Sequence, residues 1–180
     1  MKICVVGPSG SGKSTLAREL ARRFDAPHIE LDRFLWGEKW SRTDKATFDA
    51  RVDEATRGDH WVVDGNHPLV HGRAEHIVWL DFPLRVVLPR VVLRSARRLA
   101  TGEVLWNSNR ESLRRLLPIV RLRGGRFEWN DDNLFGWMVS SHRERQRVWT
   151  QRFSQLDCTL HRLRSSTEIP SLFTTIQRAR

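Results

Sequence analysis

Residues 7–15 of this 180-residue chain read GPSGSGKST, and their types and spacing suit the binding of a chain of phosphates. The stretch matches G-x-x-x-x-G-K-[ST], in which glycines let backbone N–H groups approach the ligand. Lys13 can reach the β- and γ-phosphates, and the Ser14 hydroxyl can ligate Mg²⁺. We therefore predict a site for ATP and Mg²⁺ that uses Gly7, Ser9, Gly10, Ser11, Gly12, Lys13, Ser14 and Thr15.

Two carboxylates follow short apolar runs further along the chain. Asp32 closes the run His28–Asp32, where it could bind an acceptor hydroxyl and take its proton. Asp64 closes Trp61–Asp64, where it could hold Mg²⁺ through water beside Ser14. The structural alternatives are that Asp32 caps a following helix and that Asp64 is an ordinary turn residue.

Arginines are concentrated between positions 85 and 126. That stretch contains eleven arginines and only two acidic residues, Glu103 and Glu111. Mobile arginines can close over a transferred phosphoryl group, so we assign catalytic roles to Arg94 and Arg98 beside Lys13 and Asp32. Arg94 is also expected to contact ATP. The full cluster is Arg85, Arg90, Arg94, Arg97, Arg98, Arg110, Arg114, Arg115, Arg121, Arg123 and Arg126.

The acceptor site is expected beside Asp32. An aromatic segment follows this residue, and its rings could cover a pocket or stack on a base. Packing under a loop is the alternative for each ring. The predicted acceptor-binding residues are Asp32, Trp36, Trp40, Asp64, Gly65, Asn66 and Arg110.

Five short apolar runs alternate with helical patterns, and this order must position the side chains described above. The runs lie at residues 2–6, 28–32, 61–64, 77–81 and 159–163, and long helices are predicted at 84–99 and 134–153. Such alternation indicates a three-layer α/β fold with a five-stranded parallel sheet. Right-handed crossovers then bring residues 7–15, Asp32 and Asp64 to one edge of the sheet.

Composition limits the class of protein. The length suits one domain, residues 1–180, with a lid-like insertion at about 99–133. No apolar run is long enough to cross a membrane, and the two cysteines suit a reducing cytoplasm. The net charge of +10 favours a polyphosphate or nucleic-acid partner, although a basic, arginine-rich proteome would give the same charge. A monomer or homodimer is expected.

Several blocks of the sequence resemble the adenylate-kinase-like P-loop proteins often called DNA topology modulation proteins. The resemblance implies a nucleoside/nucleotide kinase fold with strand order 2-3-1-4-5, ATP, Mg²⁺ and an Arg-rich lid that begins around Arg94. It places Asp64-Gly65 at the Asp-Gly motif of adenylate kinases, but Asn66-His67 departs from their Phe-Pro-Arg and favours an acceptor other than AMP. The blocks are GPSGSGKST, LDRFLW with Trp40, WVVDGN at 61–66, IVWLDFP at 77–83, RVVLRSARR at 90–98 and LWNSNRES at 105–112.

Three functions fit these observations. The first is an ATP-dependent phosphotransferase that acts on a small acceptor such as a nucleoside, nucleotide or other hydroxyl metabolite. The second is a nucleic-acid-associated ATPase or regulator of DNA topology, which predicts DNA binding with a steep salt dependence. The third is a non-catalytic ATP-binding switch. No helix-turn-helix or other DNA-binding module is readable in the sequence, which favours the first function.

Overall fold

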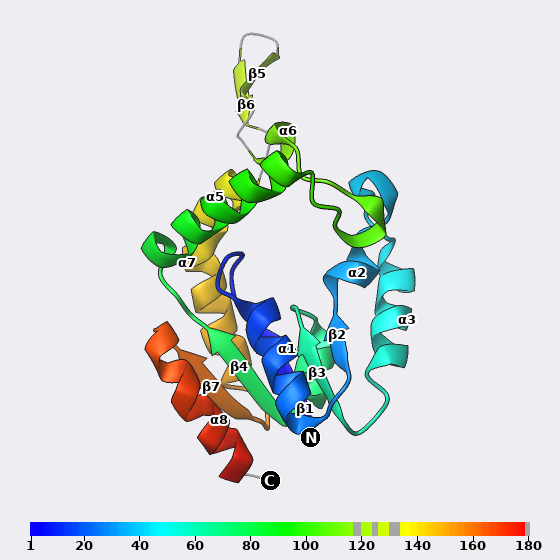
Figure 1. Cartoon of the computed structure of the whole chain (residues 1–180), viewed down its shortest axis with the longest axis vertical. Coiled ribbons are helices and arrows are strands. Elements are labelled where there is room, and N and C mark those ends of the chain that lie inside the picture. Colours follow the sequence, from blue (N-terminus) through cyan, green and yellow to red (C-terminus); the bar gives the residue numbers. More distant parts are fainter. Residues whose placement is uncertain (117–119, 124–125, 130–133, 179–180) are drawn as a thin grey trace.

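A parallel sheet forms the centre of the molecule (Figure 1). The computed structural model describes residues 1–116, 120–123, 126–129 and 134–178. Within that part, five strands pair in the order β2-β3-β1-β4-β7, and each neighbouring pair is parallel. The predicted order 2-3-1-4-5 is confirmed, with β7 as the fifth strand. The strands are β1 (Lys2–Val6), β2 (His28–Glu30), β3 (Trp61–Asp64), β4 (His76–Leu80) and β7 (Thr159–Leu163).

Helices cover both faces of this sheet, and each face has its own apolar cluster. Successive side chains of β1 point to opposite faces of the sheet. Ile3 and Val5 therefore belong to one cluster, and Cys4 and Val6 belong to the other. The first cluster includes side chains of α1 (Lys13–Phe24), α5 (Leu84–Thr101) and α8 (Ile169–Arg178). The second includes side chains of α3 (Lys45–Ala55), α4 (Pro68–Arg73) and the end of α7 (Leu134–Phe153). The predicted three-layer α/β fold is confirmed.

The remaining elements are short. Two of them are the 3₁₀ turns η1, after α2, and η2, after α5. They are far apart in the sequence but contact each other. The strands β5 and β6 form an antiparallel hairpin that stands apart from the sheet at the top of Figure 1. The elements are α2 (Asp32–Leu35), α6 (Leu113–Leu116), β5 (Val120–Arg123), β6 (Arg126–Trp129), and the 3₁₀ turns η1 (Glu38–Trp40), η2 (Trp106–Ser108) and η3 (Ser166–Glu168).

The sequence placed most element boundaries correctly, and two corrections concern the site. The second strand was expected to reach Asp32, but β2 stops at Glu30 and Asp32 begins the short helix α2. The fourth strand was expected at 77–81, but β4 runs from His76 to Leu80. The single domain of residues 1–180 with a lid-like insertion at about 99–133 stays a prediction, and 117–119, 124–125 and 130–133 lie outside the described residues.

The described helices include none that is both long enough and apolar enough to cross a membrane. Both cysteines, Cys4 and Cys158, are free thiols.

Candidate functional site

The loop between β1 and α1 has the conformation that its glycines predict. Gly10 and Gly12 have φ of 78° and 90°, in the left-handed region where glycine is favoured. The loop lies against α5, because a Cβ on Gly10 would come within 2.5 Å of Val91 Cγ2 and 2.7 Å of the Val87 carbonyl oxygen. A Cβ on Gly12 would meet no atom within 4 Å, so this position opens outward.

The first turn of α1 can receive an anion. Gly12 is the N-cap of this helix, and no side chain caps it. The N–H groups of a first helical turn lack partners inside the helix, and the helix dipole adds positive potential at the same end. Lys13 and Ser14 begin the helix and are partly buried, whereas Thr15 is exposed. The loop and the turn together suit the phosphates of a nucleotide.

Asp32 lies near this loop. Burial raises the pKa of its carboxyl, the negative charges of Asp64 and Glu30 raise it further, and Lys13 and Arg94 oppose these effects. These five groups therefore share one electrostatic environment. The capping alternative for Asp32 is not observed, because Leu31 is the N-cap of α2 and has no side-chain hydrogen bond. A carboxyl held beside a phosphate-binding lysine is placed where a proton acceptor would be useful.

Asp64 ends β3 and is buried. Its backbone oxygen accepts a hydrogen bond of 3.0 Å from the Leu31 N–H, which ties β3 to the start of α2. Its Oδ1 atom is buried without a hydrogen-bond partner among the described residues. A buried carboxylate oxygen with unused capacity suits a water of a bound Mg²⁺, with the Ser14 hydroxyl as a direct ligand. Within the described residues no cluster of three or more metal-binding side chains occurs.

Arg94 and Arg98 have different surroundings. The Arg98 guanidinium forms ion pairs with Glu103 at 3.3 Å and with Glu111 at 3.0 Å. Arg94 is partly buried, and its Nε has no hydrogen-bond partner among the described residues. Burial and the neighbouring Arg98 lower the pKa of Arg94, while the charges of Glu111 and Asp32 oppose this. Arg94 is thus the better candidate for a phosphate contact, and Arg98 braces the end of α5.

The predicted acceptor residues divide into two groups. Trp36 and Trp40 pack edge to face, with ring centroids 5.7 Å apart, and lie in the segment after α2. The indole N–H of Trp40 donates to the Arg110 carbonyl oxygen at 2.9 Å, so Arg110 contributes its backbone here. Its side chain is exposed.

The Asp-Gly turn after β3 holds the other predicted acceptor residues. Gly65 has a φ of 141°, and a Cβ there would lie 2.8 Å from the Leu31 Cβ. The glycine is thus required by close packing against the start of α2. Asn66 is exposed beside it.

Glu30 was not predicted from the sequence as a site residue. Its carboxylate accepts a hydrogen bond of 2.9 Å from the Trp106 indole and lies 3.5 Å from both Arg18 and Arg33. Burial raises its pKa, but the Trp106 hydrogen bond and the charges of His28, Arg33 and Arg18 together bring the pKa below its usual value. The sequence offered one signal for it. Glu30 lies two residues before Asp32 in the same run, and residues with this spacing lie on the same face of a strand.

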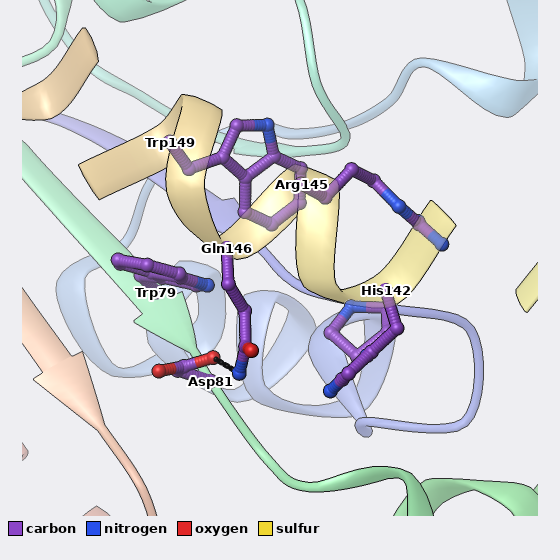
Figure 2. A pocket seen from close by; sticks show the side chains of 7 residues that line it. Trp79, Asp81, His142, Arg145, Gln146 and Trp149 are labelled. Carbon is purple, nitrogen blue, oxygen red and sulfur yellow. Dashed lines mark hydrogen bonds between the residues drawn. The ribbon is translucent and has the colours of Figure 1, made fainter. Parts of the chain in front are cut away.

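Asp81 is a second residue that the sequence analysis did not assign to a role. Its Oδ1 accepts from Gln146 of α7 at 2.6 Å, and its Oδ2 accepts from Arg162 of β7 at 2.8 Å and 2.6 Å. Figure 2 shows Asp81 and Trp79 opposite the side chains of α7, around a small cavity that Pro8 also lines. The cavity, of about 10 Å³, has room for about one water molecule and not for a larger ligand. We therefore read the hydrogen bonds of Asp81 as a structural connection between the end of β4, α7 and β7 behind the P-loop.

The three-layer sheet and the loop after β1 have the architecture of the P-loop kinase fold. In agreement, residues 3–81 match the model of the family described as "ATPase family associated with various cellular activities (AAA)". The matched range contains the P-loop, Asp32 and Asp64.

Two proteins show which enzymes the chain is similar to. Adenylate kinase 9 of Mus musculus is 51% identical over 35 residues, which is 19% of this chain and 2% of that protein. The crystal structure of shikimate kinase from Bacteroides thetaiotaomicron superimposes with a TM-score of 0.54 at 17% identity. That superposition covers 99% of this chain and 97% of the other. The likeness establishes a kinase-like fold.

Proposed function

We propose that this protein is an ATP-dependent phosphotransferase that moves the γ-phosphate of Mg-ATP to a hydroxyl group of a small acceptor. The observation that carries the proposal is the position of Asp32, whose carboxyl shares its surroundings with the P-loop lysine, Lys13. A non-catalytic nucleotide switch has no need of a carboxylate there. A kinase needs one to orient the acceptor hydroxyl and to accept its proton.

Each residue has a defined part in this proposal. The N–H groups of residues 7–15 and Lys13 bind the phosphates of ATP. Asp32 holds the acceptor hydroxyl and takes its proton as the oxygen attacks the γ-phosphorus, while the bond from that phosphorus to the bridging oxygen breaks and ADP leaves. Arg94 neutralises charge that spreads over the transferred oxygens, an effect that is large where water is excluded. A Mg²⁺ ion held by Ser14 and, through water, by Asp64 would supply further neutralisation of the phosphate oxygens.

The proposal also covers membership in the DNA topology modulation group, a location in the cytoplasm, and a monomeric or homodimeric state. The sequence blocks quoted above support the first, and the two free thiols support the second. Binding of nucleic acid belongs to the competing function, in which the basic surface would carry the activity.

The test measures transfer of labelled γ-phosphate from ATP to a panel of nucleosides, nucleotides and small alcohols. Asp32→Asn keeps the shape of the side chain and removes its basicity. We expect turnover to fall by about 10²- to 10⁴-fold. The affinity for a non-hydrolysable ATP analogue should stay the same or rise, because a negative charge near the phosphates is removed.

Asp25→Asn is the matched control. Asp25 is exposed, follows α1 and has a φ of 52°, a conformation that asparagine tolerates well. Its turnover should equal that of the wild type. Undiminished transfer by Asp32→Asn would refute the role of Asp32, and binding of ATP without transfer to any acceptor would favour the switch.

A further inference from the structure

Two loops in this chain share one backbone conformation. We name residues 36–42 loop A and residues 104–110 loop B. Each is closed by an isolated antiparallel bridge, Trp36 with Arg42 and Val104 with Arg110. The second residue of each loop donates its N–H to the sixth, at 2.8 Å in loop A and 2.7 Å in loop B. The sixth N–H donates to the third carbonyl in both, at 3.0 Å and 3.2 Å.

The loops also share an uncommon backbone feature. The two central positions have left-handed φ values, which are 54° and 59° at Lys39 and Trp40 and 53° and 62° at Asn107 and Ser108. None of the four residues is glycine. Residues with side chains adopt such angles only where the surroundings hold them there, and such positions are common at functional sites.

Asn109 joins the two loops. Its Nδ2 donates to the Gly37 carbonyl at 2.8 Å and to the Trp106 carbonyl at 2.8 Å. Its Oδ1 accepts from the Trp40 backbone N–H at 2.7 Å. The side chain is 3% exposed, so its hydrogen bonds are formed away from water. Asn107 adds a hydrogen bond from its Nδ2 to the Trp36 carbonyl.

The joined loops lie between the two halves of the proposed site. Loop A follows α2, which begins at Asp32, and loop B follows α5, which carries Arg94. Figure 1 shows α5 passing above the loop between β1 and α1, and the chain after α5 crossing over to α2. The Trp106 indole of loop B also reaches Glu30 of β2 at 2.9 Å. The joined loops therefore link the segment after α2 to the segment after α5, and Trp106 fastens loop B to β2.

We propose that Asn109 is a positioning residue that fixes the cover of this site in its closed form before any substrate binds. The inference rests on the proposed phosphotransfer and concerns the same small hydroxyl acceptor. Because loops A and B are already joined, this acceptor binds beside Asp32 without the loops parting. The end of a polynucleotide would instead require the loops to separate.

Amide hydrogen exchange on the full chain tests the joined loops, with and without Mg-ATP as the probe. In the wild type, we expect loops A and B to exchange at similar rates that Mg-ATP leaves unchanged. Asn109→Ala removes three hydrogen bonds, so both loops should exchange about tenfold faster or more, while the central strands keep their protection. In this variant Mg-ATP should slow loop B again, a response that simple local damage does not produce.

Glu38→Gln is the control on the same loop, because Glu38 is exposed and no hydrogen bond or ion pair of its side chain is found among the described residues. It should exchange as the wild type does. Trp106→Phe, which removes the hydrogen bond to Glu30 together with part of the ring, gives a second measurement if Asn109→Ala does not fold. It should speed exchange in both loops by a smaller factor. Acceleration confined to loop B, no acceleration, or slowing of the wild-type loops by Mg-ATP would each overturn the proposal.

The class of acceptor is tested by offering wild-type protein labelled ATP with a small-metabolite mixture and, separately, with an oligonucleotide. Label in a small molecule supports the inference, and label in the oligonucleotide overturns it. Label in neither, with ATP bound, refutes phosphotransfer, whereas the exchange experiment still decides whether Asn109 joins the loops.

Discussion

At the scale of single residues, the most informative group is the Asp32 carboxyl. Burial and two negative neighbours raise its pKa, and Lys13 and Arg94 limit that rise. The residue is a base only when deprotonated, so activity must fall as the pH drops through this raised pKa. We expect the acid limb of the kcat/KM profile to lie above the range of an exposed aspartate.

Arg94→Gln provides the directional check on that pH profile. The arginine lowers the pKa of Asp32, so its loss should move the acid limb to higher pH in addition to reducing turnover. An acid limb that stays in place, or moves to lower pH, would show that another group controls the profile.

Gly10 and Gly12 separate two reasons for glycine in the P-loop. Both have positive φ, which disfavours alanine by about 1–2 kcal/mol. Only Gly10 is also crowded, since its Cβ would collide with Val91 and the Val87 carbonyl. We expect Gly10→Ala to lower the free energy of unfolding by about 1–3 kcal/mol more than Gly12→Ala does, measured by urea denaturation without nucleotide. Equal losses would mean that the loop moves away from α5 without cost.

The sequence predicted the residues whose partners are close in the chain. Lys13 and Ser14 follow from a local motif, and Asp64 follows from the end of an apolar run. The surroundings of Arg98 and Trp40 depend on Glu111 and Asn109, and no local spacing reports such long-range pairs. The sequence therefore suggests residue types for the proposed site but not their long-range partners.

At the scale of elements, Asp81 joins β4, α7 and β7 behind the P-loop. It is 7% exposed and holds Gln146 and Arg162 in place. Asp81→Ala would leave the Arg162 guanidinium, which lies 4.2 Å from the Trp79 ring centroid, without its carboxylate. The substitution removes the buried acceptor of the hydrogen bonds from Gln146 and Arg162, so we expect a loss of about 3 kcal/mol in the free energy of unfolding.

Urea denaturation measures the loss at Asp81, and Lys45→Ala is the comparison. Lys45 pairs with Asp49 on the exposed side of α3, where an ion pair contributes little. Lys45→Ala should therefore leave the free energy of unfolding almost unchanged. If both variants lost equal stability, Asp81 would not be the joint that the contacts indicate.

Periodicity explains which elements the sequence predicted. The helix at 134–153 and the strand at 159–163 were predicted at the observed bounds, and both are long enough to show a pattern. The strands β5 and β6 were not predicted, because their charged residues interrupt any apolar run. The strand β3 is equally short but wholly apolar up to Asp64, and it was predicted. The end of β2 was placed too late because Leu31 and Asp32 continue the strand pattern into α2.

At the scale of the whole molecule, the P-loop connects nucleotide binding to stability. The loop follows β1, the central strand, and contacts α5 on one side and the joint at Asp81 through Pro8 on the other. A ligand that binds only the folded state must therefore stabilise the entire sheet. At a concentration 100 times its Kd, Mg-ATP should add about 2.7 kcal/mol to the free energy of unfolding.

For a chain of 180 residues, the stabilisation expected from Mg-ATP corresponds to an increase in Tm of roughly 5–10 °C. Thermal denaturation monitored by tryptophan fluorescence can measure this increase. Lys13→Ala should abolish most of the shift, because it removes the charge that reaches the phosphates and leaves the fold intact. Lys45→Ala is the matched control, since it removes one exposed lysine from α3 and should keep the full shift. A shift of equal size in all three proteins would show that ATP stabilises the chain through its general positive charge and not through the P-loop.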